Sequence, residues 1–333
     1  MKVLKIPLSQ SIRTGETIVT TENDSLDHET LLGDSMKISV IIPVYNAEKY
    51  VKRAVESALQ QKECGEVILV EDRSPDNALE VCRDLCEMSN KVFLYQHENN
   101  QNKGPGPSRN LGALKATNDY IAFLDADDIY LPGRFKKSSE LLMNNSKLDG
   151  IYEPVGSSFE NEESKRRFFV AHSDEVAMVK KEVEPENLFE CLISGRYGYI
   201  HPNGLLLRRK AFIDVGMFPE LRLHEDTILN LKLALLCRLA PGETKKPVSM
   251  RLLHMNNTIT KPGIDFLPSQ HVALEHLIRW MKGKNISKCR EKMIEARYYR
   301  LKYQLFKQRG KMFAAVLYYL YYHAIFKKHT ILD

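Results

Sequence analysis

Three carboxylates stand within four positions near the middle of the chain, in the stretch AFLDADDIY at residues 122–130. Asp125, Asp127 and Asp128 follow an apolar run, and charges of one sign at this spacing repel one another and shift one another's pKa values. A solvated turn after a strand would offset that repulsion. A bound divalent cation would do so as well, because Mg2+ and Mn2+ take carboxylate oxygens and Mg2+ often shares them with substrate phosphates.

The residues around this cluster predict the elements that position it. ISVIIPVY, from Ile38, is a continuous apolar run typical of a parallel strand, and residues 47–61 have helical periodicity. EVILVED, KVFLYQH and DYIAFLDADD are predicted as further strands, with helices at residues 77–88 and in SRNLGALKAT between them. This alternation predicts an α/β fold with a parallel sheet and helices on both faces.

Polar residues follow three of these predicted strands. The first ends in PVYN at residues 43–46, the second in Glu71-Asp72, and the fourth in the aspartate cluster. In open α/β sheets, ligands bind outside the carboxyl ends of the strands. The convergence of polar groups at that edge favours a ligand or cation site over a solvated turn.

Six ordered stretches carry a family resemblance: IIPVYN, VEDRSPD, NKGPGPSRNLG, FLDADD, HEDT and RLLHMNNTIT. In order and spacing they resemble the inverting family 2 glycosyltransferases of the bacterial surface-polysaccharide type, over residues 37 to about 260. The resemblance implies a GT-A (nucleotide-diphospho-sugar transferase) fold, with a mostly parallel sheet flanked by helices. It also implies transfer of a sugar from a nucleotide-sugar, most simply a UDP-sugar, to an acceptor hydroxyl.

On the donor side, the resemblance assigns roles at the first two strand ends. Asp72 matches the carboxylate that recognises uracil. Pro43, Tyr45 and Asn46 match the segment that passes under the base and ribose, and a purely structural role in the core is the alternative for Pro43 and Tyr45.

The glycine- and proline-rich loop at residues 102–112 matches the family pattern N-x-G-x-x-x-A-R-N-x-G, with Ser108 in place of the alanine. Glycines permit close backbone approach, and a guanidinium at a helix start can pair with diphosphate oxygens or with a base carbonyl. Arg109 is the expected donor-binding residue of this loop.

The resemblance also places a metal at the aspartate cluster. Asp127 is the expected ligand of Mg2+ or Mn2+, Asp125 is expected to contact ribose or a metal-bound water, and Asp128 is the alternative ligand. His254 matches a histidine that binds the diphosphate or completes the metal shell in some relatives. Because the arginine that usually precedes it by two positions lies one residue further back, at Arg251, a structural His254 is the alternative.

The stretch His224-Glu225-Asp226 precedes a helical pattern, where acidic residues also favour the positive end of the helix dipole. By resemblance, Asp226 is the base that deprotonates the acceptor hydroxyl. A carboxylate is a weak base toward an alcohol, so it must lie within hydrogen-bond reach of it. Most relatives carry another acidic residue two or three positions later, where Ile228 and Leu229 stand here.

Charge is divided unevenly along the chain. Residues 261–333 hold 15 Lys/Arg and 5 Asp/Glu, whereas residues 1–260 hold 33 and 38. Within the basic region, residues 312–326 are almost entirely apolar or aromatic. This composition predicts a helix at an anionic membrane interface, or a helix packed on the catalytic domain or on a second subunit in a homodimer. No nucleic-acid-binding module accompanies the charge, so nucleic acid is not an expected partner.

Three regions are expected: a polar extension at residues 1–35 with a short strand in KVLKI, a GT-A catalytic domain at 36–262, and a helical C-terminal region at 263–333 in pieces separated near Gly283 and Gly310. Without a continuous apolar signal segment or a membrane-length apolar run, the expected location is the cytoplasm, peripheral to the inner face of the cell membrane. The six cysteines form no CxxC pair and are expected to be reduced thiols.

Two rival functions use similar residues. A sugar-nucleotide pyrophosphorylase would need a phosphate-cradling glycine-rich loop after the first strand, and PVYNAEKY contains no glycine. A non-catalytic nucleotide-sugar-binding scaffold would bind the donor without releasing its nucleotide. The donor sugar, the acceptor (a glycan or a lipid-linked glycan) and the linkage would be set by residues 150–205 and by the C-terminal helices.

Overall fold

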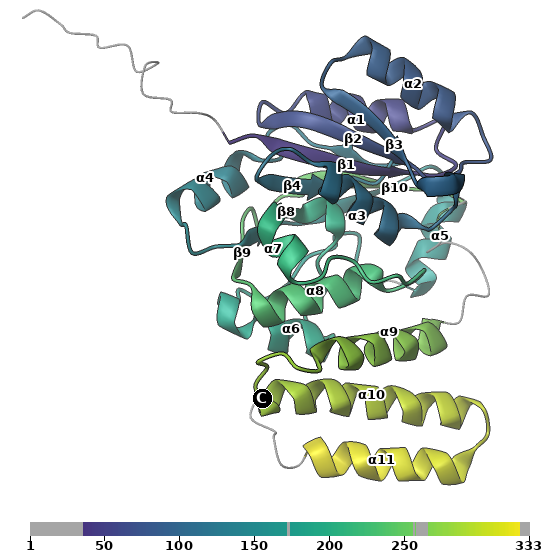
Figure 1. The fold of residues 1–333 in the computed structure, drawn as a ribbon. Coiled ribbons are helices and arrows are strands. Elements are labelled where there is room, and N and C mark those ends of the chain that lie inside the picture. Colours follow the sequence, from purple (N-terminus) through teal and green to yellow (C-terminus); the bar gives the residue numbers. More distant parts are fainter. Residues whose placement is uncertain (1–35, 172–173, 256, 258–265, 327–333) are drawn as a thin grey trace, which may run out of the picture. The chain divides into compact units, whose positions relative to one another are not determined.

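The computed structural model describes residues 36–171, 174–255, 257 and 266–326. The predicted strand in KVLKI and the boundary at residues 262–263 lie outside these residues. The described part contains two β-sheets and a series of helices (Figure 1).

The larger sheet has seven strands in the order β3-β2-β1-β4-β8-β6-β9. Its strands are β1 (Ile38–Val44), β2 (Cys64–Glu71), β3 (Val92–Gln96), β4 (Tyr120–Phe123), β6 (Gly150–Tyr152), β8 (Leu205–Arg208) and β9 (Leu239–Pro241). β1 to β4 are parallel, β8 is antiparallel to its neighbours β4 and β6, and β9 is parallel to β6. The expected mostly parallel α/β sheet is confirmed. β4 ends at Phe123, however, so the three aspartates lie in a turn after the strand that was predicted to include them.

A second sheet of three strands has the order β5-β10-β7. Its strands are β5 (Ile129–Tyr130), β7 (Val155–Phe159) and β10 (Ser249–Leu253). β5 follows the aspartate turn directly, and β10 pairs with it. This pairing places the chain from residue 249 onward beside the aspartates.

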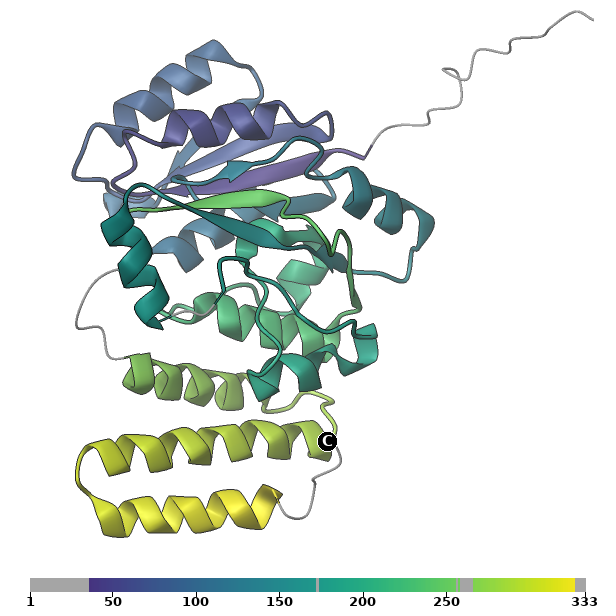
Figure 2. The same cartoon turned by 180° about the vertical axis from the view of Figure 1, so that it is seen from behind.

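Helices cover both faces of the larger sheet (Figures 1 and 2). Those that share a core with one face are α1 (Val51–Leu59), α2 (Ala78–Met88) and α4 (Lys136–Asn144). Those that share the core of the other face are α3 (Pro105–Lys115), α6 (Leu188–Ser194), α7 (Arg209–Asp214) and α8 (Glu225–Leu236). Shorter or peripheral helices are η1 (Glu98–Asn100), α5 (Glu162–Ala171), η2 (Pro185–Asn187) and η3 (Pro202–Gly204).

The last glycine of the loop motif explains how closely α3 approaches the sheet. A β-carbon at Gly112 would lie 2.4 Å from Cγ2 of Ile41 in β1, which no real contact allows. Glycine at this position lets α3 lie directly on β1, and this contact fixes the start of α3 near the strand ends.

The C-terminal region forms three helices, α9 (Phe266–Met281), α10 (Lys288–Gln308) and α11 (Met312–Phe326), which confirms the predicted breaks near Gly283 and Gly310. None of the helices in the described ranges combines the length and the apolar character needed to cross a membrane. The six cysteines, all in described segments, are free thiols, as expected.

Candidate functional site

The ends of β1, β2 and β4 lie side by side at one edge of the larger sheet. The backbone N–H of Asp72 donates to Val44 O at 2.8 Å, and that of Leu124 donates to Ile41 O at 3.0 Å. The polar residues that follow these three strands therefore converge, as the sequence predicted.

Asp72 holds the glycine-rich loop at this edge. It is buried, and its two oxygens accept hydrogen bonds from the backbone N–H groups of Lys103 at 2.7 Å and Gly104 at 2.8 Å. Burial raises the pKa of Asp72 above its usual value, although these two N–H donors and nearby His97 oppose the shift. The carboxylate is thus fixed in place. Each of its oxygens keeps a lone pair that could accept a further hydrogen bond.

The other residues of the first strand end lie at the rim. Pro43 is the sixth residue of β1, and the Tyr45 side chain is 54% exposed. Asn46 has a positive φ of 52°, and its N–H donates to Ser74 Oγ at 3.2 Å. Tyr45 is therefore not a core residue, and the turn after β1 is held to the turn after β2.

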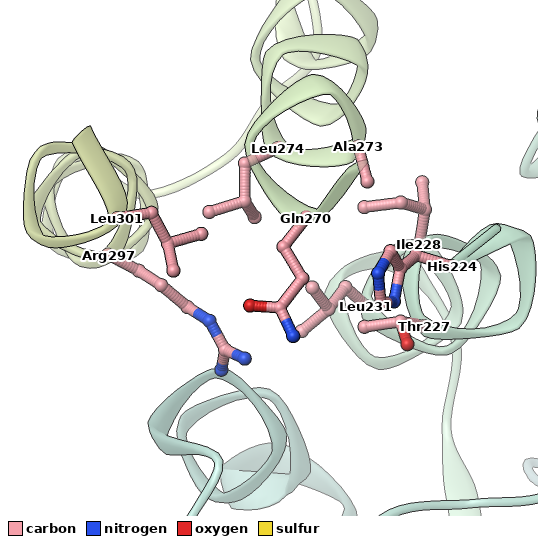
Figure 3. A pocket seen from close by; sticks show the side chains of 9 residues that line it. All are labelled: His224, Thr227, Ile228, Leu231, Gln270, Ala273, Leu274, Arg297 and Leu301. Carbon is pink, nitrogen blue, oxygen red and sulfur yellow. The ribbon is translucent and has the colours of Figure 1, made fainter. Parts of the chain in front are cut away.

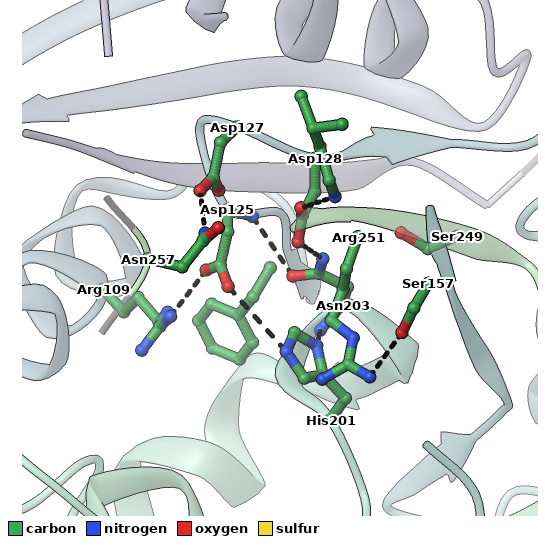
Figure 4. A network of polar contacts seen from close by, with 12 residues as sticks. Arg109, Asp125, Asp127, Asp128, Ser157, His201, Asn203, Ser249, Arg251 and Asn257 are labelled. Atoms are coloured by element: carbon green, nitrogen blue, oxygen red, sulfur yellow. Dashed lines mark hydrogen bonds and ion pairs between the residues drawn. The ribbon is translucent and has the colours of Figure 1, made fainter. Parts of the chain in front are cut away.

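Arg109 joins the aspartate turn to the start of α8, and Figure 4 shows its contact with Asp125. Its guanidinium is buried; Nη2 donates to Asp125 Oδ1 at 2.6 Å and Nη1 donates to Glu225 Oε1 at 3.3 Å. Burial alone would raise the pKa of Asp125, but the charge of Arg109 holds it below its usual value. One guanidinium thus brings together two acidic motifs that are far apart in the sequence.

Asp128 is directed into the protein. It is 4% exposed, its Oδ2 accepts from Asn203 Nδ2 at 2.7 Å, and its Oδ1 accepts from the backbone N–H of Leu252 at 2.8 Å. Burial, together with the charges of Asp127 and Asp125, raises its pKa well above the usual value. Both oxygens are used in holding β10 and η3 against the turn.

Asp127 lies next to His254. Its side chain is 25% exposed, its Oδ2 lies 3.2 Å from His254 Nε2, and the same oxygen accepts from Asn257 Nδ2 at 2.9 Å. The His254 ring stacks on Tyr50, with ring centroids 4.9 Å apart. The structure therefore brings together the carboxylate and the imidazole that were predicted to share a metal.

His201 and Asn203 were not predicted from the sequence. Side-chain atoms of Asp125, Asp128 and His201 that could bind a metal lie within 4.8 Å of one another. However, His201 Nδ1 accepts from the backbone N–H of Asn203 at 3.3 Å, which leaves the ring proton on the Nε2 that faces Asp125. Burial, and then the charge of Arg251, lowers the pKa of His201 to about 3, so the ring is neutral; its Nε2 lies 4.0 Å from Asp125 Oδ2, beyond hydrogen-bond reach.

Arg251 was noted in the sequence as displaced from the family position, but its setting was not predicted. It lies in β10 and donates to Tyr199 Oη at 3.1 Å and to Ser157 Oγ at 2.7 Å, beside His201 (Figure 4). The stretch HPNG at residues 201–204 is the sequence signal that could have pointed to His201 and Asn203. Its glycine is required in the structure, because a β-carbon at Gly204 would lie 2.2 Å from Glu153 O.

Asp226 lies in the first turn of α8. It is partly exposed, and its Oδ1 accepts from the backbone N–H of Thr227 at 2.6 Å. The preceding Glu225 has a side chain that is only 13% exposed and pairs with Arg109, and desolvation together with the charge of Asp226 raises its pKa to about 7. The two carboxylates of this pair therefore have different environments.

A small cavity of about 60 Å³ lies behind the start of α8, between α8, α9 and α10 (Figure 3). His224 precedes Glu225 with a positive φ of 65°, and its Nε2 lies 3.1 Å from Ser269 Oγ of α9. The C-terminal region thus contacts the residue that sets the direction of α8.

A larger pocket of about 410 Å³ lies at the same sheet edge, where β6 and β9 end. It is lined by residues 152–154, 178–182, 241 and 243–245. Part of its wall falls within residues 150–205, the segment predicted to select the substrate.

The family model described as glycosyl transferase family 2 matches residues 39–216. Two proteins of Haemophilus influenzae named as uncharacterized glycosyltransferases are similar to the chain. One is 38% identical over 32% of this chain and 43% of its own length. The other is 26% identical over 71% of this chain and 77% of its own length. Glycosyltransferase GlyA of Streptococcus pneumoniae is 29% identical over 60% of this chain and 28% of its own length. This chain therefore spans less than half of the first and third of these relatives.

Solved structures share the fold. S. aureus TarS (residues 1–349) in complex with UDP-GlcNAc has a TM-score of 0.60 at 20% identity, over 81% of this chain and 73% of that one. The mannosyltransferase PcManGT from Pyrobaculum calidifontis, in complex with GDP-Man and Mn2+, has a TM-score of 0.51 at 14% identity, over 86% of this chain and 75% of that one. The central sheet, its flanking helices and the C-terminal helices form a GT-A-like fold.

Proposed function

Because the chain belongs to glycosyl transferase family 2, we propose that it is a metal-dependent inverting glycosyltransferase. It would move a sugar from a nucleotide-sugar, most simply a UDP-sugar, to the hydroxyl of a glycan or lipid-linked acceptor. The observation that carries the proposal is the Arg109 bridge, because it holds the donor-side Asp125 and the Glu225-Asp226 pair at one site.

The donor nucleotide would lie across the ends of β1, β2 and β4. Asp72 would accept a base N–H, and the exposed ring of Tyr45 would lie beside the base. Asp125 would contact the ribose, and Arg109 the diphosphate or the base. The UDP-GlcNAc in the TarS structure favours uridine.

Asp127 and His254, with Asp125 beside them, would hold Mg2+ or Mn2+. Their chemistry fits such an ion, since an imidazole nitrogen and a partly exposed carboxylate oxygen lie 3.2 Å apart, whereas both oxygens of Asp128 are already used. The Mn2+ in the PcManGT structure supports this assignment. When bound, the ion stabilises negative charge on the departing diphosphate.

Asp226 would be the general base. Single displacement breaks the bond between the anomeric carbon and the diphosphate oxygen and forms a bond to the acceptor oxygen on the opposite face, which inverts the configuration. The acceptor's proton passes to Asp226, which must lie within hydrogen-bond reach of the hydroxyl. The 410 Å³ pocket beside β6 and β9 would receive the part of the acceptor that does not react.

The proposed setting is surface-polysaccharide or lipid-linked oligosaccharide assembly, in the cytoplasm at the inner face of the cell membrane. Residues 36–262 would form the catalytic domain and residues 263–333 a C-terminal region that supports it. A chain lacking residues 1–35 should therefore keep its activity.

The proposal is tested by incubating the full chain with Mn2+ and a panel of nucleotide-sugars, and by measuring the nucleoside diphosphate that is released with and without glycan acceptors. We expect release with one donor class, and a fall of about 10²- to 10⁴-fold in Asp226→Asn. Asp214→Asn, an exposed aspartate at the end of α7, is the matched control and should behave as the native chain. A protein that binds a donor but releases no nucleotide under any condition would be a scaffold.

A further inference from the structure

Helix α11 has one packed face and one uncovered face. Its packed face lies on α10, where Tyr318 stacks near Tyr299 and Phe306 with ring centroids 6.1 and 5.3 Å apart, and where Ala315 is fully buried. Lys302 of α10 lies over the Tyr318 ring at 5.1 Å. These contacts fix which side of α11 faces outward.

The outward side is apolar along its described length. Phe313 is 83% exposed and Leu320 is 57% exposed. Met312, Val316 and Leu317 are also exposed, and helical spacing places all five on one side of α11. No Asp, Glu, Lys or Arg occurs in residues 312–322. We call these five residues the outer face. An apolar surface of this extent commonly marks a contact with a partner or a membrane.

The catalytic domain does not cover the outer face within the described residues. Figures 1 and 2 both show α9, α10 and α11 as successive layers, with α9 beside α8 and α11 outermost. The sequence predicted that residues 312–326 contact a membrane, the catalytic domain or a second subunit. The catalytic domain is therefore excluded as the partner of the outer face, and a second copy of the chain or a lipid surface is left.

Charge decides between these two. Residues 288–311 contain nine Lys/Arg and two Glu. Lys307 at the end of α10, and Arg309 and Lys311 in the connection to α11, are exposed, and we call these three residues the basic turn. These three make no ion pair with another described residue. In the sequence, Lys327 and Lys328 follow directly after α11, so both ends of this segment are basic. Two copies paired through their outer faces, parallel or antiparallel, would bring basic ends together.

We propose that the outer face of α11 and the basic turn bind the surface of an anionic lipid bilayer. The apolar side chains would enter the boundary between headgroups and acyl chains, the cations would contact lipid phosphates, and the rim tyrosines 319 and 321 would lie at headgroup level, where amphipathic rings are favoured. This deepens the proposed membrane setting by naming the surface, and it does not depend on Asp226 being the base.

The test is flotation of the full chain with vesicles of phosphatidylcholine, with and without phosphatidylglycerol, in the absence of donor and acceptor. We expect binding to the anionic vesicles that weakens with added salt. The variant Phe313→Ser/Leu317→Ser/Leu320→Ser should lose at least about tenfold in binding, and Lys307→Gln/Arg309→Gln/Lys311→Gln should lose its preference for anionic lipid. The matched control, Met88→Ser/Met143→Ser, removes exposed apolar side chains from α2 and α4 and should bind as the native chain.

Circular dichroism and nucleotide release toward a soluble glycan acceptor confirm that each variant is folded. Absence of flotation by the native chain, or equal losses in the outer-face variant and the control, would overturn the proposal. So would a dimer, seen by light scattering, that the outer-face substitutions dissolve while vesicle binding stays absent. Vesicle binding without any nucleotide release would instead retain this inference and remove the proposed catalytic function.

Discussion

Two adjacent acidic pairs in the site divide their roles in the same way. In the turn after β4, Asp128 is buried and Asp127 is partly open. At the start of α8, the Glu225 side chain is only 13% exposed and pairs with Arg109, whereas Asp226 is partly exposed and, among the described residues, bonds only to the neighbouring Thr227. In each pair, one carboxylate is used in holding elements together, and its more exposed neighbour is the one proposed above as metal ligand or as base. Residue type alone does not show which member has which task.

Asp128 and Glu225 are held differently. Asp128 accepts hydrogen bonds from an amide and a backbone N–H, which are uncharged, whereas Glu225 pairs with the guanidinium of Arg109. The aspartate turn can therefore keep its shape without a charge, but the link to α8 depends on one cation. Substitutions in the two pairs should therefore differ in how much they lower stability and in how that stability depends on pH.

The largest effect is expected from Arg109→Met, which removes the cation between the pairs. Asp125 and Glu225 would lose their shared partner, and breaking a buried ion pair from one side typically costs about 3–5 kcal/mol of unfolding free energy. Urea denaturation measures the loss. Arg166→Met, an exposed arginine on α5, is the control and should change stability by less than about 0.5 kcal/mol. A loss below about 1 kcal/mol in Arg109→Met would contradict the bridge.

Asp127→Asn and Asp128→Asn should have opposite signatures. The first should weaken Mn2+ binding in the presence of UDP by at least about 100-fold, because it removes a charged ligand oxygen. The second should leave Mn2+ affinity within a few-fold but lower the unfolding free energy by about 1–3 kcal/mol, since an amide cannot accept both hydrogen bonds that Asp128 accepts. Calorimetric titration and urea denaturation measure the two quantities. The reverse pattern would make Asp128 the ligand.

Glu225→Gln should change how stability depends on pH. The native pKa of about 7 lies above the ordinary value of 4.5 that Glu225 has in the unfolded chain, so between these values the folded state retains a proton that the unfolded state releases. The unfolding free energy should therefore fall as pH rises through this window, by up to about 3 kcal/mol, and level off above pH 7. The variant should lose this part of the slope, whereas Glu87→Gln, an exposed residue of α2, should keep it. Asp128, whose pKa is also raised, contributes slope of the same sign in all three proteins. Identical slopes in all three would exclude a protonated Glu225.

The sequence predicted the donor side of this site better than the acceptor side. β1, β2 and β4 were found because buried parallel strands are continuous apolar runs, and their adjacency followed from the alternation with helices. The segment at residues 157–187 is rich in charged residues and shows no clear strand pattern, yet it contains part of β7 and the helix α5, whose Phe168 packs on Phe159. The short run LLLR of β8 gives no sign of its antiparallel direction.

The contacts of the aspartates could not be predicted from local pattern. Asp128 meets Asn203, and Asp127 meets His254, across 75 and 127 residues of sequence. Asn203 lies in η3, and His254 directly follows β10, which pairs with the two-residue strand β5; neither strand has a strong periodic signal. His254 was placed by resemblance, whereas His201 and Asn203 had no such support. The position of each side chain was set by long-range pairing, which a single sequence does not display.

The smallest effect is expected from Ser269→Ala, which tests whether α9 helps to place the proposed base. His224 adopts a left-handed conformation that is uncommon for a residue other than glycine, and Ser269 Oγ lies 3.1 Å from its ring. Losing one such hydrogen bond should let the start of α8 shift and lower kcat by about three- to tenfold, with the donor KM unchanged.

His224→Asn should retain most activity, because asparagine tolerates this conformation and its amide can still bond to Ser269. Ser287→Ala removes the N-cap of α10 and serves as the control, since it should cost about 1 kcal/mol of stability without changing kcat. If Ser269→Ala and Ser287→Ala both lower stability and neither changes kcat, the C-terminal helices support the fold but not the base. If Ser269→Ala alone lowers kcat, then the pair at the start of α8 depends on a contact from outside the catalytic domain, whereas the contacts seen for the aspartate turn all come from within it.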